Sequence, residues 1–353
     1  MAPAVIAGFD RLVAAVQANC HVTDARHARN MTMCTSLLEM RELYRWESGA
    51  AQTAQLPRGE VATWLTGREA LWAAFEEAEY LPLPVAGGEV DPFDAAAVNH
   101  ALLPHDLVYG AGIGRFGKPQ FFLGALEREE SRDGVRILVA RREYARDLAP
   151  AVAALRDGTI TVRLESLRRV LWEKVEGWTV KRPDGALRAA LDAYDFAGDA
   201  EAALERMAAA EAETLILHEL GESRAGRLLG PEWEAMLSGL TRRRAEVFAR
   251  AARDHLADCL VTLPALLERD AAASIHLWFA SLDGMRRELF PRLAGAYAAW
   301  RDGDRGRALR AAAESGVAHW QGVCGQILAL HAQHGDDAEA AIEALAEAAD
   351  ARL

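Results

Sequence analysis

The sequence predicts two domains, an N-terminal α+β domain with a small, mainly antiparallel sheet and a C-terminal all-α helical bundle. Short runs rich in β-branched and aromatic residues, separated by Gly, Pro and Asp, occur only between about residues 105 and 165. After the breaker segment Trp178–Gly185, apolar residues recur with helical spacing almost to the end of the chain. We therefore expect the α+β domain over residues 1–180 and the helical bundle over residues 186–353.

The first part of the chain is predicted to be helical. Helix-spaced apolar residues indicate helices over residues 3–18, 21–48 and 60–80, with an interruption at Leu56–Gly59. The segment Leu81–Gly88 is rich in Pro and Gly, and it therefore ends this helical part.

Strands are predicted next, each as a short apolar run bounded by turn residues. These runs are Leu107–Gly114, Gln120–Leu126, Val135–Ala140 and Thr159–Leu164. Arg132–Gly134 is typical of a hairpin turn. Helices over residues 143–156 and 165–176 are expected to flank the last strand.

The C-terminal domain is predicted to consist of long helices followed by a charged helix after Asp336. The expected helices cover residues 186–193, 199–224, 231–262, 271–299 and 304–333. Pro231 follows Gly230 at a predicted helix start, whereas Pro264 and Pro291 are expected to end or bend helices.

Composition and charge exclude several classes of protein. The net charge of −12 argues against a general nucleic-acid binder, which needs a basic surface. No uncharged apolar stretch is long enough to span a bilayer, and the N-terminus lacks the features of a signal peptide. The four cysteines are widely spaced without a C-x-x-C pair, which favours free thiols in a reducing compartment. We expect a cytoplasmic protein with no nucleic-acid and no membrane partner.

Metal-ligating residue types gather on the apolar faces of the predicted C-terminal helices. His218 and Glu222 are four residues apart, so one helical face presents an imidazole beside a carboxylate, and Glu211 lies on the same stripe. A carboxylate on an apolar stripe is costly unless it is paired or binds a metal. The other long helices each carry one histidine on the apolar face, namely His255, His276 and His319. Because bundle cores build metal sites from such residues, we predict that these six bind iron, with manganese or zinc as alternatives.

The element His218-x-x-x-Glu222 resembles one helix of the hemerythrin class, and the predicted plan is similar to carboxylate-bridged di-iron bundles. The resemblance covers this motif alone, because the His-x-x-x-His of hemerythrins and the paired Glu-x-x-His of ferritin-like proteins are missing. With the donor types, it implies a metal-dependent oxidoreductase or an oxygen-handling protein. The alternative is that these histidines are core residues whose ring nitrogens form hydrogen bonds with neighbouring carboxylates or backbone carbonyls. Helical spacing relates only residues within one helix, so it does not show whether histidines on different helices come together.

A second group of metal-ligating or redox-active residue types falls on one helical face in the N-terminal part of the chain. Its members are Cys20, Asp24, His27, Met31, Cys34 and Leu38. Over this span Cys20 and Cys34 are about 21 Å apart at a rise of about 1.5 Å per residue, so one ion cannot contact both. Core packing is therefore the preferred interpretation of this stripe.

The run Gly112–Gly117 has the form G-x-G-x-x-G, which in dinucleotide-binding folds opens a helix. Lys118–Gly124 favours an extended chain instead, so we interpret the glycines as a turn or a close backbone approach. Flanking polar residues are candidates for lining a pocket for an anionic small molecule, namely His105, Asp106, Tyr109, Arg115 and Lys118.

A second class of function is a non-catalytic small-molecule-binding or scaffolding protein, in the form of a homodimer. The nine tryptophans and the apolar segment Leu277–Ala280 supply candidates for a partner surface. Finally, Met31–Arg41, His218–Glu222 and Leu282–Pro291 are similar to segments of bacterial proteins grouped under domains of unknown function. That resemblance implies no activity.

Overall fold

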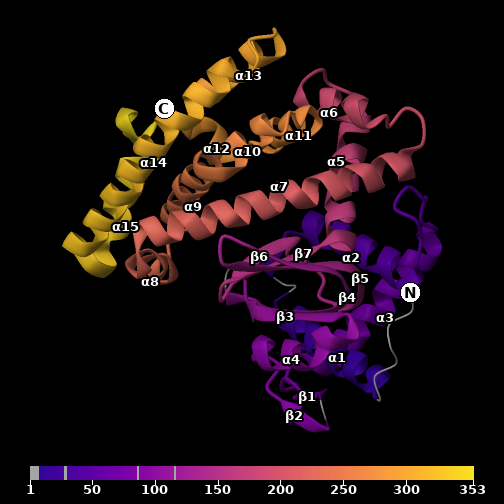
Figure 1. Ribbon diagram of the computed structural model, residues 1–353. Coiled ribbons are helices and arrows are strands. Elements are labelled where there is room, and N and C mark those ends of the chain that lie inside the picture. Colours follow the sequence, from indigo (N-terminus) through magenta and orange to yellow (C-terminus); the bar gives the residue numbers. More distant parts are fainter. Residues whose placement is uncertain (1–7, 28–29, 86, 115–116) are drawn as a thin grey trace. The chain divides into compact units, whose positions relative to one another are not determined.

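The computed structural model describes residues 8–27, 30–85, 87–114 and 117–353 (Figure 1). The chain divides into two compact units, each assembled from several segments. The first comprises residues 1–154, 161–176 and 200–208, and the second residues 155–160, 177–199 and 209–353. The two-domain layout is confirmed, because helices and sheet make up the N-terminal region and the C-terminal region is mostly helical.

The helices of the first unit begin with α1 (Phe9–His27), which runs without a break through the junction predicted between residues 18 and 21. α2 (Met33–Ser48) follows, capped by the Thr32 hydroxyl, which accepts a hydrogen bond from the Thr35 N–H. The remaining helices are α3 (Arg58–Phe75), α4 (Ala95–Leu102), the short 3₁₀ helix Leu103–His105 and the start of α5 (Leu164–Lys181). The first residues of the helix predicted over residues 3–18 lie outside the described residues, as do residues 28–29.

The stripe predicted on one helical face from Cys20 to Leu38 is divided between two helices, so that interpretation of the spacing is wrong. Cys20 and Asp24 are buried on α1, whereas Cys34 and Leu38 are exposed on α2. The change of helix between His27 and Met33 breaks the angular relationship that a continuous helix would have kept.

The main sheet is a five-stranded, curled half-barrel rather than the small sheet predicted. Its strands are β3 (Leu107–Ile113), β4 (Pro119–Arg132), β5 (Val135–Arg146), β6 (Ala153–Arg156) and β7 (Thr159–Arg163). They lie in the order β3-β4-β5-β7-β6, and β4 pairs antiparallel with both β3 and β5. A separate antiparallel pair is formed by β1 (Leu83–Val85) and β2 (Gly88–Val90).

The sheet is larger than predicted because β4 and β5 extend to 14 and 12 residues, through charged segments that lack an apolar run. The β4–β5 register shifts at three places between Leu123 and Arg128, and such bulges bend strands and increase their twist. A Cβ on Gly124 would lie 2.7 Å from the Arg142 carbonyl oxygen, so the close approach at this bend requires glycine. Pairing with β4 also overrides the helix predicted from residue 143, since residues 143–146 belong to β5.

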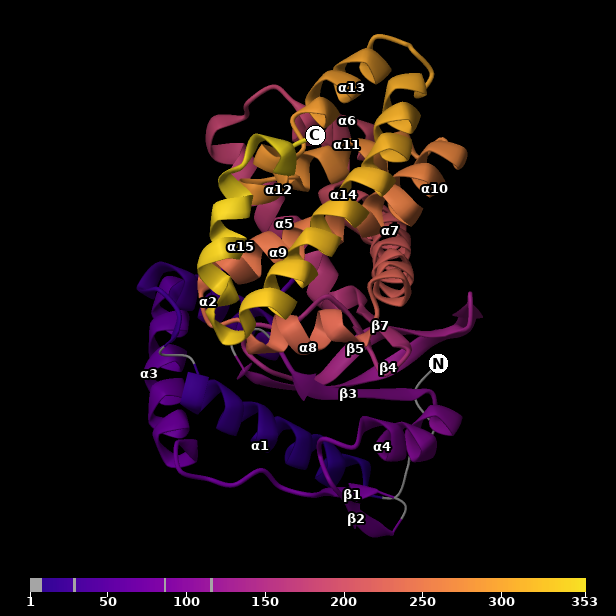
Figure 2. The same cartoon turned by 90° about the vertical axis from the view of Figure 1, so that its left-hand side faces the viewer.

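The core of the first unit lies between α1 and the sheet. α1 packs against β4 and β5, and α4 packs against β3 (Figure 2). Leu12, Val16 and Cys20 of α1 contact a buried set from the strands that includes Tyr109 and Phe121. Each of these five side chains is at most 2% exposed, so α1 supplies a large part of this core.

The second unit is built from helices, several of which differ in extent from those predicted. They are α6 (Ala186–Tyr194), α7 (Ala200–Leu229, most of it in this unit), α8 (Pro231–Gly239), α9 (Arg243–Ala257), a π-helical turn (Asp258–Thr262), α10 (Leu263–Glu268), α11 (Ala272–Ser281), α12 (Gly284–Leu289), α13 (Arg292–Arg301), α14 (Arg307–His334) and α15 (Ala338–Glu347). The helix predicted over residues 231–262 breaks before Arg243, and that over 271–299 breaks at Leu282 and again before Pro291. α9 packs against α12, α14 and α15, and therefore occupies the centre of this unit.

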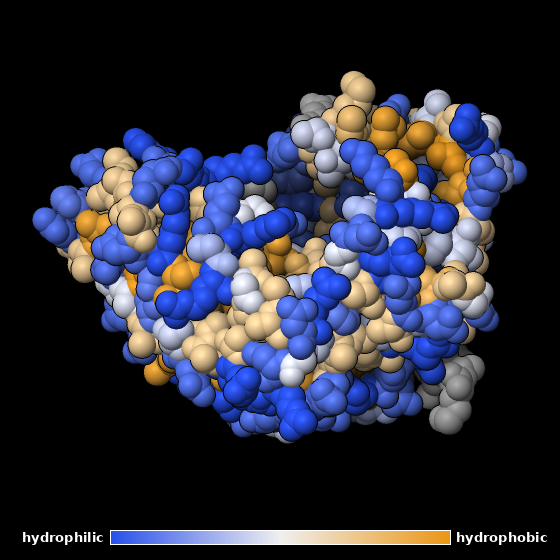
Figure 3. All heavy atoms as spheres, turned by 90° about the horizontal axis from the view of Figure 1, so that it is seen from above, coloured by the Kyte–Doolittle hydropathy of each residue, from blue (hydrophilic) through white to orange (hydrophobic). Residues whose placement is uncertain are grey.

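The surface is mainly hydrophilic on the face shown in Figure 3, with smaller groups of hydrophobic residues between the charged ones. Large exposed apolar side chains include Met33, Leu37 and Leu38, all on α2. Within the described ranges, none of the helices combines the length and the apolar character needed to cross a membrane.

Candidate functional site

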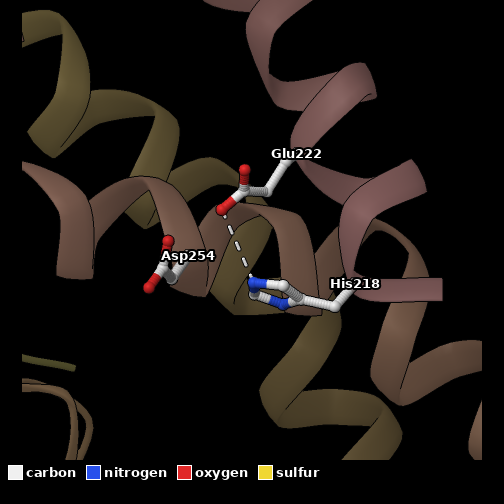
Figure 4. Close-up of side chains that lie close together, drawn as sticks. All are labelled: His218, Glu222 and Asp254. Carbon is white, nitrogen blue, oxygen red and sulfur yellow. Dashed lines mark ion pairs between the residues drawn. The ribbon is translucent and has the colours of Figure 1, made fainter. Parts of the chain in front are cut away.

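His218, Glu222 and Asp254 form a compact group in the second unit. His218 and Glu222 lie one turn apart on α7, with the His218 Nε2 3.5 Å from the Glu222 Oε1. Asp254 approaches from α9 (Figure 4). One ligand atom from each of the three residues lies within 4.8 Å of the others, and no further group of this kind occurs among the residues that the structure describes. The predicted pair His218 and Glu222 therefore meets a carboxylate from a second helix.

Gly221 explains how α7 and α9 come close enough to form this group. A Cβ at position 221 would lie 2.5 Å from the carbonyl oxygen of Ala257, on the backbone of α9. A Cβ atom at this distance would overlap the carbonyl oxygen, so the two helix backbones can come this close only because residue 221 is glycine. The glycine stands between His218 and Glu222 in the sequence, and it therefore brings both side chains towards Asp254.

Asp258 orients the His218 imidazole from the side of the ring opposite to Glu222. The His218 Nδ1 lies 2.8 Å from the Asp258 Oδ1, to which it donates a hydrogen bond, and this leaves Nε2 facing Glu222. The Asp258 side chain is only 1% exposed, and it also accepts a hydrogen bond from the Arg286 guanidinium. Asp258 is the first residue of the π-helical turn, a type of irregularity that often marks functional sites.

The charges of the group shift the pKa values of its members in opposite directions. Burial disfavours a charged imidazole, yet the carboxylates of Asp258 and Glu222 raise the pKa of His218 well above its usual range. Burial would also raise the pKa of Glu222, but His218 and Arg253 lower it to about 2. Burial and the neighbouring Glu222 charge raise the pKa of Glu219 to about 7. Glu222 is therefore ionised at neutral pH, and His218 and Arg253 supply the positive charge that balances it.

Arg253 forms ion pairs with both carboxylates. Its Nη2 donates to the Glu222 Oε1 at 2.6 Å and lies 3.6 Å from the Asp254 Oδ1. Nη1 lies 3.4 Å from the Glu234 Oε1. One imidazole and two carboxylates are a donor set that suits iron, manganese or zinc, so the group could hold a divalent ion in competition with this guanidinium.

The other predicted ligands lie elsewhere, so the expected convergence of four histidines is not found. His255 directs Nε2 to the Arg286 carbonyl oxygen at 2.8 Å, and its ring stacks on Trp320. Burial and the Arg286 charge lower the pKa of His255 to about 3, which keeps this imidazole neutral. The remaining three have other neighbours: Glu211 accepts from the Tyr194 hydroxyl at 3.0 Å, His276 bonds the Tyr297 hydroxyl at 2.7 Å and the His319 ring contacts Trp320.

Asp254, as a member of the group, and Asp258, as the hydrogen-bond partner of His218, were not predicted from the sequence. Asp254 lies near the end of α9 and Asp258 begins the π-helical turn that follows, four residues later, so a paired-carboxylate spacing was present in the sequence. Nothing in that spacing related them to His218, because the contact depends on the close approach of α7 at Gly221.

The described glycines of the run Gly112–Gly117 lie at the end of β3 or just before β4, and β4 is a strand rather than the helix that opens in a nucleotide-binding fold. The Gly114 N–H donates to the Lys118 carbonyl oxygen at 2.7 Å, and β4 begins directly afterwards. Lys118 contacts the Asp24 carboxylate at 3.1 Å, and the Tyr109 hydroxyl donates to the Pro92 carbonyl oxygen. Two of the proposed pocket residues are thus engaged within the unit, while Arg115 lies outside the described residues.

Comparison with known proteins identifies two family models along the chain. Residues 11–163 match the N-terminal domain, and residues 168–349 the C-terminal domain, of a family of unknown function, DUF6866. No curated protein and no solved structure matches the chain. The matches lend no support to the hemerythrin-like resemblance, and they do not extend to a bacterial source.

Proposed function

The chain belongs to the DUF6866 family, and from its site we propose that it binds a divalent transition metal, iron or manganese, through His218, Glu222 and Asp254. The observation that carries this proposal is the meeting of the three ligand atoms within 4.8 Å, with Asp258 hydrogen-bonded to the far nitrogen of the imidazole. Metal-binding histidines usually donate their second N–H to such a carboxylate, which fixes the tautomer and the ring orientation.

The donor types favour iron or manganese over structural zinc. Structural zinc sites are closed and commonly include cysteine, whereas this group offers one imidazole and two carboxylates. Three protein ligands leave coordination positions open for a substrate. We therefore propose an oxidoreductase or oxygen-handling protein with a small-molecule substrate, in which α7 and α9 position the ion and Asp258 holds the His218 Nε2 towards it.

The experiment is metal analysis of protein purified without chelator or affinity metal, combined with Mn²⁺ titration. We expect about one ion per chain in the parent, and its loss in His218→Ala, Glu222→Ala and Asp254→Ala. His276→Ala is the matched control, because this half-buried histidine bonds Tyr297 instead. Equal metal content in the parent and in His218→Ala would remove the proposal.

A second candidate is favoured by the ion pairs of Arg253 and Arg286, which already neutralise part of the carboxylate group. If no metal binds, the cluster is a structural network in a non-catalytic small-molecule-binding or scaffolding protein. A homodimer belongs to this candidate, and a clean monomer in light scattering at micromolar concentration would contradict that form. A cytoplasmic location, where the four free cysteines would stay reduced, is part of both candidates.

A further inference from the structure

Arg253 lies where a cation bound to the two ligand carboxylates would have to lie. A single nitrogen, Nη2, is 2.6 Å from the Glu222 Oε1 and 3.6 Å from the Asp254 Oδ1. The same Glu222 oxygen faces the His218 Nε2 at 3.5 Å. The guanidinium therefore occupies the edge of the group at which the three ligand atoms meet.

The other contacts of Arg253 indicate where it would go if an ion took its place. Nη1 lies 3.4 Å from Glu234 on α8, whose side chain is 65% exposed. Nε is buried and has no hydrogen-bond partner in the described part of the chain, so the guanidinium is incompletely satisfied in its present position. A small rotation towards Glu234 would exchange one carboxylate partner for another without leaving the charge unpaired.

We propose that Arg253 is a tethered competitor of the metal, which holds Glu222 and Asp254 in the metal-free protein and turns to Glu234 when the ion binds. This inference rests on the proposed metal site. In it, the affinity for the metal is set by Arg253 and Glu234, neither of which is a ligand. The physical reason is electrostatic: two carboxylates are neutralised either by the guanidinium or by the ion, and placing both cations at one oxygen edge is repulsive. The metal affinity then depends on how readily Arg253 leaves Glu222 and Asp254 and pairs with Glu234 instead.

The test is Mn²⁺ binding by titration calorimetry and by electron paramagnetic resonance of the free ion. Arg253→Met removes the competitor and is expected to raise the affinity about tenfold or more, since a competing conformation lowers apparent affinity by its population. Glu234→Gln removes the outward partner and is expected to lower the affinity about two- to threefold, in keeping with the small energies of exposed ion pairs. In the Arg253→Met background, Glu234→Gln should have no effect.

The outcomes separate this inference from the metal site itself. If Arg253→Met binds Mn²⁺ with equal or lower affinity while His218→Ala abolishes binding, the site stands and the competitor role is overturned. If His218→Ala leaves binding unchanged, the metal site itself is overturned. Glu234→Gln alters an exposed side chain, so it still gives a result if Arg253→Met does not fold. An effect of Glu234→Gln that persists in the double variant would also contradict the exchange.

Discussion

The Asp258 Oδ1 lies 2.8 Å from the His218 Nδ1, and this hydrogen bond decides which nitrogen of the imidazole faces the other carboxylates. Asp258 is buried and also paired with Arg286, so it is held in place independently of His218. The histidine is thus pre-oriented before any ion arrives. Pre-orientation of this kind reduces the cost of assembling a binding site.

Asp258→Asn is therefore expected to weaken metal binding although residue 258 is not a ligand. The amide oxygen can still accept from Nδ1, but it lacks the charge that makes the imidazole a strong donor ligand and that pairs with Arg286. We expect Mn²⁺ affinity to fall about 10- to 100-fold, the range found for supporting carboxylates. Titration calorimetry on folded protein measures this, with Glu211→Gln as control, since Glu211 is a buried carboxylate bonded to Tyr194 instead. An unchanged affinity in Asp258→Asn would contradict the positioning role.

Gly221 provides a second prediction, because its hydrogen is the only group that fits against the Ala257 carbonyl oxygen. Gly221→Ala should push α7 and α9 apart and destabilise the fold by about 1–3 kcal/mol, as overpacking usually does. Metal binding should weaken with it. Gly226→Ala on the same helix has no neighbour within 4 Å of the added Cβ, and it should stabilise by up to about 1 kcal/mol. Chemical denaturation of both variants measures the difference, and similar effects of the two would contradict the tight helix contact.

Two of the three residues of the group, His218 and Glu222, were predictable from the sequence, and Asp254 was not. His218 and Glu222 share one helix, where the 3.6-residue period relates them directly. Asp254 lies on another helix, and its position depends on the crossing of α7 and α9, which no periodicity encodes. The same limit applied to His255, His276 and His319, whose apolar faces were predicted but whose directions relative to one another were not.

The fold was predictable to the same extent. The two domains were predicted from the change between strand-like runs and helical periodicity. This was possible because the strand period of two residues and the helix period of 3.6 residues can both be recognised within a short segment. The lengths of β4 and β5 were not predictable, because the outer halves of these strands are charged and are stabilised by pairing between the strands. Pairing is a tertiary effect, and it also converted the alanine-containing segment after residue 143 from a predicted helix into a strand.

Glu143 of β5 provides a prediction about pH in the first unit. Its carboxylate is buried, accepts from the Arg163 Nη2 at 2.5 Å and from the Ser166 hydroxyl, and lies near Arg146. Burial would raise the pKa of Glu143, but these arginines lower it from 4.5 to about 2. A carboxylate with a lowered pKa in the folded state stabilises above its unfolded pKa, and this stabilisation is lost as the pH falls from 4.5 to about 2.

The loss should amount to about 3 kcal/mol at most, from about 1.36 kcal/mol per pKa unit. Glu143→Gln should therefore flatten the acid limb of the stability profile, measured by urea denaturation at a series of pH values. At neutral pH it should cost about 3–5 kcal/mol, because it leaves buried arginines without their counter-charge. Glu129→Gln is the control, since the Glu129–Arg136 pair is largely exposed and should contribute less than about 1 kcal/mol. An acid limb in Glu143→Gln as steep as that of the parent would contradict the assignment.

Metal addition and removal should change the stability of the second unit. An ion that binds the folded protein alone stabilises it by about 2.7 kcal/mol when its free concentration is 100 times Kd. We therefore expect Mn²⁺ to raise the Tm of the parent in calorimetry, and excess chelator to reverse the rise. His218→Ala should show neither effect, whereas His276→Ala should behave like the parent, because His276 bonds Tyr297 away from the ligand group. Arg253→Met should give the larger Mn²⁺-dependent rise, since its metal-free form leaves Glu222 and Asp254 without their guanidinium partner. A rise of equal size in His218→Ala would mean that the ion acts at another place on the protein.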